Sequence, residues 1–269
     1  MNKIPCTVGI LTKNNGRTIR RALESIKDFT DIVICDGGST DDTVSIAHAA
    51  GARVIEQDKN YLDAQGRIAD FSAVRNQMYR TAKEPWFIYL DSDEYLSPEL
   101  IESIRSAVVS SAPGAFYVLR RYIWKGNEVT CATTYPNISV RLVERSVSPG
   151  FIKKVHERFN LQENIIPRPL VGALFVPLGD GQGPNRSKGD YYIQLHINGL
   201  LESGRPFLLV FWHALWWHVV VSVKYLLRYI YNLVACRGTH MPVAFEFERH
   251  MYHFRLILSL WRARHRFNT

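Results

Sequence analysis

The stretch Phe87-Ile88-Tyr89-Leu90-Asp91-Ser92-Asp93-Glu94 decides the fold. Its apolar residues, 87–90, have the pattern of a buried strand, and three acids follow where that strand leaves the sheet. In an open α/β sheet, ligands bind beyond the carboxyl ends of the strands. Asp91 and Asp93 could therefore share a hard divalent cation and a hydroxylated or phosphorylated ligand. The same residues also suit a plain strand-to-helix turn, because Ser97-Pro98-Glu99 begins a helix.

Strand and helix patterns alternate through the N-terminal part of the chain. Strands are predicted at 7–11, 31–35, 53–56 and up to Asp91, and helices at 18–26, 42–50 and 72–82. This alternation is typical of a parallel sheet with helices on both faces, so the fold class is α/β. Strand-like runs separated by turns at 115–143 indicate a mixed or antiparallel extension of the sheet. Residues 177–189, rich in Gly and Pro, predict a long loop.

A chain of 269 residues has room for one substantial domain and an appendage. The net charge of +8 and the pI near 9.3 indicate an anionic partner, such as nucleotide phosphates, an acidic membrane surface or nucleic acid. Beyond Gly204 the only acids are Glu246 and Glu248, whereas Lys and Arg recur. These basic residues lie among Trp, Leu and Val in helical runs, so we expect no nucleic-acid partner.

The cysteines, Cys6, Cys35, Cys131 and Cys236, are widely scattered and form no CxxC pair or Cys/His cluster. Cys6 and Cys35 lie in predicted buried strands, which indicates reduced structural thiols in a cytosolic compartment. No structural zinc site is predicted. Residues 1–5 lead directly into a strand without a long apolar signal region, so the sequence does not argue for secretion.

The C-terminal part has a helical and very apolar pattern. Residues 207–223 carry no formal charge and hold Trp212, Trp216 and Trp217. A stretch of about 17 residues is at the lower limit for crossing a bilayer. A second helix, roughly Val243 to Arg264, ends in a basic run. Three interpretations stay open: helices lying on an anionic membrane surface, which we favour, a core or dimer interface, and a spanning helix.

Polar turns follow three of the predicted strands. Asn14 and Asn15 follow the first, residues 36–41 the second, and residues 91–94 a later one. Because parallel strands of one sheet end at a common edge, we expect these turns to lie close together. Gly37-Gly38 supplies the backbone freedom that a closely approaching ligand needs. By itself, Asp36-Gly37-Gly38-Ser39-Thr40-Asp41 is also the sequence of an ordinary capped turn, and the residues alone leave both interpretations open.

In combination, these motifs resemble family 2 glycosyltransferases. The resemblance rests on Val8-Gly9-Ile10-Leu11-Thr12-Lys13-Asn14, Ile34-Cys35-Asp36-Gly37-Gly38-Ser39-Thr40-Asp41-Asp42-Thr43, Arg75-Asn76 and Leu90-Asp91-Ser92-Asp93-Glu94. It is closest over roughly residues 4–160 and implies the nucleotide-diphosphosugar transferase (GT-A) fold, a Rossmann-like mixed sheet. Tyr135-Pro136, Arg141-Leu142 and Val155-His156-Glu157 are similar to the branch of bacterial lipooligosaccharide-core glucosyltransferases. On this basis we expect a GT-A domain at 1–190 and a helical membrane-associating region at 191–269.

The resemblance implies roles for single residues. Asp36 would accept a hydrogen bond from the uracil ring, Asp91 would bind ribose or sugar hydroxyls, and Asp93 would bind Mg²⁺ or Mn²⁺ at the diphosphate. Arg75 would assist at the phosphates or hold the aspartates, with a structural ion pair as the alternative. Many family members carry an acid or a serine at the position of Gly37, so a hydrogen bond is missing here. The other residues of the implied nucleotide site are Thr12, Asn14, Gly38 and Ser39.

Sugar transfer to an alcohol needs a general base beside the acceptor hydroxyl. The family pattern favours Glu157 as this base, with His156 as a metal or diphosphate contact. Glu94 and Asp180 remain open as other candidates. One base and one metal suffice for direct displacement at the anomeric carbon with inversion.

We therefore expect an inverting, metal-dependent glycosyltransferase that uses a nucleotide-diphosphate sugar, foremost a UDP-sugar. The expected acceptor is a membrane-bound glycolipid, either a lipopolysaccharide core or a polyprenyl-linked intermediate, at the cytoplasmic face of the inner membrane. One alternative is an inactive sugar-nucleotide-binding or scaffold subunit, which the retention of Asp36, Asp91 and Asp93 argues against. The other is a sugar nucleotidyltransferase, which usually has a Gly-rich loop where residues 12–16 stand.

Overall fold

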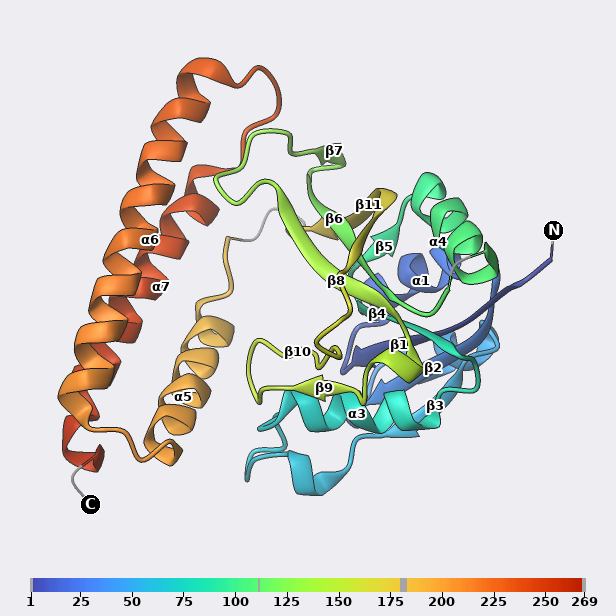
Figure 1. Ribbon diagram of the computed structural model, residues 1–269, viewed down its shortest axis with the longest axis horizontal. Helices are drawn as coiled ribbons and strands as arrows, with labels where there is room; N and C mark the ends of the chain where they lie inside the picture. The colour runs from blue at the N-terminus through green and yellow to red at the C-terminus, as the bar shows by residue number, and fades with distance from the viewer. Residues whose placement is uncertain (1, 111, 180–182, 268–269) are drawn as a thin grey trace. The chain divides into compact units, whose positions relative to one another are not determined.

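The computed structural model describes residues 2–110, 112–179 and 183–267 (Figure 1). The chain forms two compact units, one of residues 1–121 and 136–177, the other of residues 122–135 and 178–269. The predicted domain division between residues 190 and 191 stays a prediction.

The first unit begins with the alternation of strands and helices that the sequence predicts. Its elements up to the acidic turn are β1 (Ile4–Thr12), α1 (Gly16–Ser25), β2 (Phe29–Asp36), α2 (Thr43–Ala49), β3 (Arg53–Glu56), η1 (Lys59–Tyr61), α3 (Phe71–Thr81) and β4 (Trp86–Asp91). Helix α3 begins where the Asp70 carboxylate accepts a hydrogen bond from the Ala73 amide at 2.9 Å. Such an N-cap gives a hydrogen-bond partner to a backbone N–H of the first turn, which has no partner inside the helix.

The remaining elements of this unit include the strands that extend the sheet. These elements are β5 (Tyr95–Leu96), α4 (Pro98–Ser110), β6 (Ala115–Trp124), β8 (Asn137–Glu144), η2 (Arg145–Val147), β9 (Phe151–Ile152), β10 (Arg158–Phe159) and β11 (Arg168–Pro177). Strand order in the main sheet is β3-β2-β1-β4-β8-β6-β11-β5, and β9 and β10 form a separate two-stranded sheet. Strand β1 pairs in parallel with β2 and β4, whereas β8 runs antiparallel to β4 and β6. The mixed sheet confirms the predicted antiparallel extension.

The sheet has a hydrophobic core on each face, and successive residues of a strand point alternately into the two cores. In β4, Ile88 and Leu90 belong to one hydrophobic core, and Phe87 and Tyr89 to the other. A continuous apolar run is thus the pattern that a doubly covered strand requires. It also leaves the carboxyl end of β4 as the place where polar side chains can gather.

The second unit is mainly helical. It contains β7 (Asn127–Glu128), which pairs with the end of β6, and then α5 (Arg186–Glu202), α6 (Phe207–Ala235), α7 (Val243–Arg262) and η3 (Arg264–Phe267). The predicted 177–189 loop is shorter than expected, because α5 already begins at Arg186. In the described part of the chain, α6 alone is long and apolar enough to cross a membrane, judged by length and composition.

The cysteines fall into two classes. Cys6 and Cys35 are buried, unpaired thiols in β1 and β2, as the sequence indicates. Cys131 and Cys236 form a disulfide within the second unit. The expectation of reduced thiols therefore does not extend to this pair, whose 105-residue separation left no local signal.

Candidate active site

The site lies at the carboxyl ends of three neighbouring strands. In the parallel pairing, Thr12 at the end of β1 lies opposite Asp36 at the end of β2. On the other side of β1, Leu11 lies opposite Asp91 at the end of β4. The register therefore confirms that the polar turns meet at one sheet edge.

Hydrogen bonds join the turns after β1 and β2. The Asn14 amide donates to Ser39 Oγ at 2.8 Å, and the Thr40 amide donates to Asn14 Oδ1 at 2.8 Å. The carboxylate of Asp36 accepts from the amides of Gly38 and Ser39 at 3.0 and 2.8 Å. Gly38 has φ +80°, a backbone region that other residues rarely adopt. Asp36 thus also holds its own turn, as an ordinary capped turn would.

Two features of this turn bear on the implied nucleotide site. A Cβ on Gly37 would lie 3.0 Å from Gln57 Oε1 and 3.2 Å from Lys13 Cδ, so the larger residues of other family members would require these neighbours to move. Thr12 is buried, and its hydroxyl donates to Asn15 Oδ1 at 3.3 Å. The hydrogen bond missing at Gly37 is therefore not restored by a simple substitution.

Arg75 connects two carboxylates at the site. Its Nη2 donates to Asp91 Oδ1 at 2.8 Å, and its Nε donates to Glu157 Oε1 at 2.5 Å. The guanidinium lies 4.4 Å from the centre of the Tyr89 ring, and its side chain is only 5% exposed. Its third nitrogen, Nη1, is buried and has no hydrogen-bond partner in the described part of the chain. A buried donor of this kind suits an anionic ligand.

These ion pairs set the protonation of the site. Desolvation alone would raise the pKa of Asp91, but Arg75, followed by Arg141 and Arg120, holds this pKa well below its ordinary value. Desolvation alone would lower the pKa of Arg75, but the charges of Asp91 and Glu157 raise it. Asp91 is therefore an anion, and Arg75 a cation, at any physiological pH.

Glu94 is buried, whereas its acidic neighbours Asp91 and Asp93 are partly exposed. It is 1% exposed, and its Oε1 accepts from Arg120 at 2.7 Å and from Arg141 at 3.1 Å. Its Oε2 accepts from the Asp91 amide at 3.0 Å, which closes the acidic turn. Glu94 is thus a buried structural anion rather than a base open to an acceptor. The other open candidate, Asp180, lies outside the described residues.

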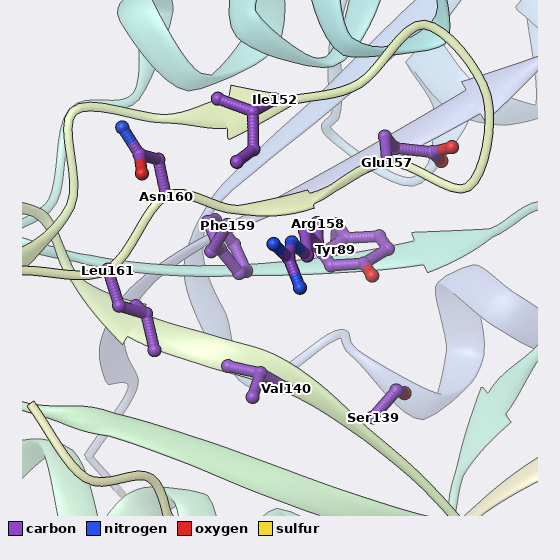
Figure 2. Close-up of a pocket in the computed structure, with 9 residues that line it drawn as sticks. All are labelled: Tyr89, Ser139, Val140, Ile152, Glu157, Arg158, Phe159, Asn160 and Leu161. Atoms are coloured by element: carbon purple, nitrogen blue, oxygen red, sulfur yellow. The ribbon is translucent and has the colours of Figure 1, made fainter.

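A cavity of about 500 Å³ lies beside Glu157 (Figure 2). The short hairpin of β9 and β10 forms one side, and Ser139 and Val140 of β8 form another. Tyr89 and Arg158 also line it. Glu157 is 14% exposed on its side chain, and no hydrogen bond engages its Oε2 in the described residues. One carboxylate oxygen is therefore held by Arg75 while the other can meet a ligand.

The acidic residues can hold a divalent cation only together with a ligand. Asp93 is half-buried in the turn after β4, and His156 is exposed on the β9–β10 hairpin with φ 56°. Within the described ranges, no group of three or more His, Cys, Asp or Glu side chains could hold a metal. Mg²⁺ commonly binds through one or two carboxylates plus substrate phosphates. Asp91 and Asp93 fit that mode and not a site made of protein ligands alone.

The sequence predicted Arg75 at this site but gave no role to Arg120 or Arg141. The guanidinium of Arg141 lies 4.2 Å from the centre of the Tyr89 ring, and the guanidinium of Arg75 contacts the same ring. It is 4% exposed, and together with Arg120 it holds Glu94. A charged residue inside the apolar run 140–143 of a central strand was the available signal.

The chain matches one family model. Residues 7–165 match the family described as Glycosyl transferase family 2. An uncharacterized glycosyltransferase of Rickettsia typhi is 26% identical over 221 residues, which are 77% of this chain and 73% of that protein. A TPR repeat-containing protein of Synechococcus elongatus is 36% identical over 112 residues, 41% of this chain. This chain covers only 26% of that longer protein.

Solved structures with a similar arrangement are also known. TarS of S. aureus, residues 1–349 in complex with UDP-GlcNAc, is 14% identical with a TM-score of 0.49, over 95% of this chain and 73% of that one. Glucosyl-3-phosphoglycerate synthase of Mycobacterium tuberculosis, in complex with Mn²⁺, UDP and glucosyl-3-phosphoglycerate, is 14% identical with a TM-score of 0.48, over 73% and 79%. The observed mixed α/β sheet agrees with the GT-A fold that is expected of the matched family, while the lipooligosaccharide-core branch stays a prediction.

Proposed function

The chain belongs to glycosyl transferase family 2, and on that premise we propose that it moves a sugar from a UDP-sugar to a membrane-borne glycolipid with inversion. The observation that carries the proposal is the meeting of Asp36, Asp91, Arg75 and Glu157 around the carboxyl ends of β2, β1 and β4. Nucleotides bind at this edge of open α/β sheets.

The donor would lie along the sheet edge. Asp36 accepts a hydrogen bond from the ring N–H of the base, in addition to the amides that hold its turn. Asp91, kept ionised by Arg75, accepts hydrogen bonds from ribose or sugar hydroxyls. Nη1 of Arg75, which has no partner among the described residues, donates a hydrogen bond to an oxygen of the bound UDP-sugar. Thr12, Asn14, Gly38 and Ser39 form the wall of the nucleotide site.

Asp93, with Asp91 beside it, would hold Mg²⁺ or Mn²⁺ against the two phosphates. The bound cation would neutralise negative charge on the departing diphosphate. His156 is proposed as a diphosphate contact on the exposed hairpin, where a backbone in the left-handed region is often found at functional sites.

Glu157 is proposed as the general base. Its Oε1 is fixed by Arg75, so its free Oε2 has a defined position at the cavity, where it can accept the proton of an acceptor hydroxyl. The hydroxyl oxygen then attacks the anomeric carbon as the bond to the diphosphate breaks. A single displacement of this kind inverts the configuration.

The acceptor would be a lipopolysaccharide core or a polyprenyl-linked glycolipid at the cytoplasmic face of the inner membrane. Support comes from α6, whose apolar side chains are largely exposed. Trp212, Trp216 and Trp217 are between 59% and 70% exposed, a costly arrangement in water. Aromatic-rich helices with flanking cations suit a membrane interface.

Nucleotide binding measured by calorimetry tests the donor site. UDP, GDP and CMP are titrated with and without Mn²⁺ into the wild type, Asp93→Asn and the control Asp28→Asn, an exposed acid away from the site. We expect UDP to bind more tightly with Mn²⁺, and only Asp93→Asn to lose this gain. Absence of binding of all three nucleotides in lipid would contradict the proposal.

Slow donor hydrolysis separates a live enzyme from a binding subunit. The wild type should release UDP from a UDP-sugar without an acceptor, and Asp93→Asn should not. Binding without any hydrolysis would favour the scaffold alternative.

A further inference from the structure

Helix α6 presents a long apolar surface that none of the described residues of its own unit covers. Its exposed side chains include Trp212, Trp216, Val220, Leu227 and Val234, which are 41–86% exposed. Helix α7 adds an exposed stripe of Val243, Phe247, Phe254 and Trp261. Their spacings of four and seven residues place them on one side of that helix. We call these exposed side chains of α6 and α7 the apolar face.

The opposite side of α6 is packed within the second unit. Val210 of α6 lies in a small core with Ile193 and Ile197 of α5 and with Leu256 and Leu260 of α7. The helix is therefore two-sided, and its apolar face is a surface rather than a core. This excludes the interpretation in which α6 is a core helix of its own unit, because only 6% of its most apolar window is buried.

Helices α6 and α7 run side by side in opposite directions (Figure 1). The rings of Phe211 and Trp261 lie 5.3 Å apart near one end of the pair. His218 and His253 meet farther along, and the Arg249 guanidinium lies 5.9 Å from the Tyr225 ring centre beyond them. Anything that surrounds α6 along its length must therefore also reach α7.

The charged side chains of α7 argue against placing the α6–α7 helix pair across the hydrocarbon core of a bilayer. Glu248 pairs with Arg255 and with Arg186 of α5, and Asp190 of α5 pairs with Arg255 at 3.0 Å. Ionised groups are costly at the centre of a bilayer, and α7 carries several of them beside α6. A path of α6 across the membrane would draw these groups along with it.

Along the segment that carries the apolar face, residues 205–267, the exposed charges all have one sign. Within residues 205–267, all of which the structure describes, the exposed formally charged side chains are Arg205, Lys224, Arg237, Arg262 and Arg266. The acids of the same range are withdrawn: Glu246 is buried against Thr133, and Glu248 is ion-paired. The surface therefore complements an anionic partner.

We propose that the apolar face of α6 and α7 docks in the plane of an anionic lipid bilayer, with α6 lying along the interface instead of crossing it. Apolar side chains enter the headgroup boundary, and the cations around them meet lipid phosphates. This surface deepens the proposed use of a membrane-borne acceptor. Its tests need neither donor nor acceptor, so they can fail or succeed independently of the sugar transfer.

Vesicle flotation of the full chain tests the docking. Vesicles of phosphatidylcholine alone are compared with vesicles of equal parts phosphatidylcholine and phosphatidylglycerol. We expect binding to the mixed vesicles that weakens with salt. Trp216→Asp and Leu227→Asp should each weaken it at least about tenfold, because a carboxylate replaces an apolar side chain in the interface. The matched control, Val109→Asp on α4, replaces an equally exposed residue and should bind like the wild type.

Depth measurements separate a lying helix from a spanning one. Single nitroxide labels are placed at Leu209→Cys, Val220→Cys, Leu227→Cys and Val234→Cys, positions on one side of α6. Between the first and last of these the helix is about 37 Å long. A lying helix gives all four labels a similar depth, about 5–10 Å below the headgroups.

Three results would overturn the proposal. Depths that change steadily along α6 would mean that the helix spans. Equal binding of Trp216→Asp and the wild type would mean that the apolar face does not dock. A concentration-dependent dimer without lipid, abolished by Trp216→Asp, would assign the face to a second copy of the chain.

Discussion

Arg75 Nε lies 2.5 Å from Oε1 of Glu157, a residue 82 positions further along the chain. The same guanidinium binds Asp91, so one buried cation links the end of β4 to the β9–β10 hairpin. The proposed base and the proposed sugar-binding acid therefore have fixed positions relative to each other. A point charge on a flexible stem could not hold both carboxylates in this way.

Glu157→Gln should separate chemistry from binding. The amide can still accept a hydrogen bond from Arg75 but takes up a proton poorly. We expect UDP affinity to stay within about twofold and turnover to fall by about 10²–10⁴-fold. Calorimetry and UDP release measure the two effects. The control is Glu163→Gln, an exposed acid six residues on, and unchanged turnover of Glu157→Gln would remove Glu157 from the role of base.

Arg75→Lys should weaken the donor site itself. Lysine cannot donate to Asp91 and Glu157 in the geometry of a planar guanidinium, so Asp91 loses its fixed position. We expect UDP affinity in Mn²⁺ to fall about tenfold, together with a lower Tm. Arg80→Lys, on the exposed side of the same helix, serves as the control. An unchanged UDP affinity would leave Arg75 with a purely structural ion pair.

Glu94→Gln should destabilise the first unit. Loss of the carboxylate leaves Arg120 and Arg141 facing a neutral group in a buried place. Breaking a buried ion pair from one side costs about 3–5 kcal/mol. Urea unfolding measures this loss, and Glu163→Gln, at an exposed acid outside the helices and strands, should cost almost nothing. Surface ion pairs contribute less than about 1 kcal/mol. A loss of unfolding free energy below that value would show that Glu94 is not the anchor of the turn.

Reduction should destabilise the second unit and leave the first intact. The disulfide of Cys131 and Cys236 closes a long loop, and such bonds contribute about 3–5 kcal/mol. The paired Ser variant at both positions should lower the Tm of the helical unit while UDP affinity persists. Thiol titration of the denatured, non-reduced protein should find only Cys6 and Cys35 reactive. Four reactive thiols would contradict the bond.

The second unit should also lose stability in acid. Burial, and then the charges of His218, His250 and Arg249, lowers the pKa of His253 to about 4. Burial, followed by His196, lowers that of His218. Because unfolded histidine has a pKa of about 6.5, the contribution of neutral His253 to stability is complete above that pH and is lost as the pH falls through about 4. In thermal melts, the Tm of His253→Gln should depend less steeply on pH than that of the wild type. The exposed control His48→Gln should keep the pH dependence of the wild type.

The fold was readable from local patterns. The alternation of apolar runs and helical periodicity predicted β1 to β4 and their helices with bounds that differ by at most three residues, because each signal lies within about ten residues. The boundaries of α7 agree as well, with Val243 at its start. The loop before α5 was predicted too long, since the Asn185 side chain already caps that helix by accepting from the Lys188 amide.

The partners of the site residues were not readable. Glu94 had been one of several possible bases, and burial under Arg120 and Arg141 gives it a structural place instead. The two arginines come from β6 and β8, far from the acidic turn in sequence. Long-range charge pairing leaves no periodic signal, which is why Arg75 was predicted from its motif but the pairing of Arg120 and Arg141 with Glu94 was missed.

By itself the sequence determined the α/β alternation and the acids at the end of β4, since strand alternation and turn chemistry are local properties of the residues, and its motifs carried the resemblance to family 2 glycosyltransferases. Only the tertiary structure decided that Arg75 joins Asp91 to Glu157, that Cys131 pairs with Cys236, and that α6 is packed on one side and bare on the other. Each of these depends on which distant segments meet, and the free energy that selects among such contacts is a property of the packed chain as a whole.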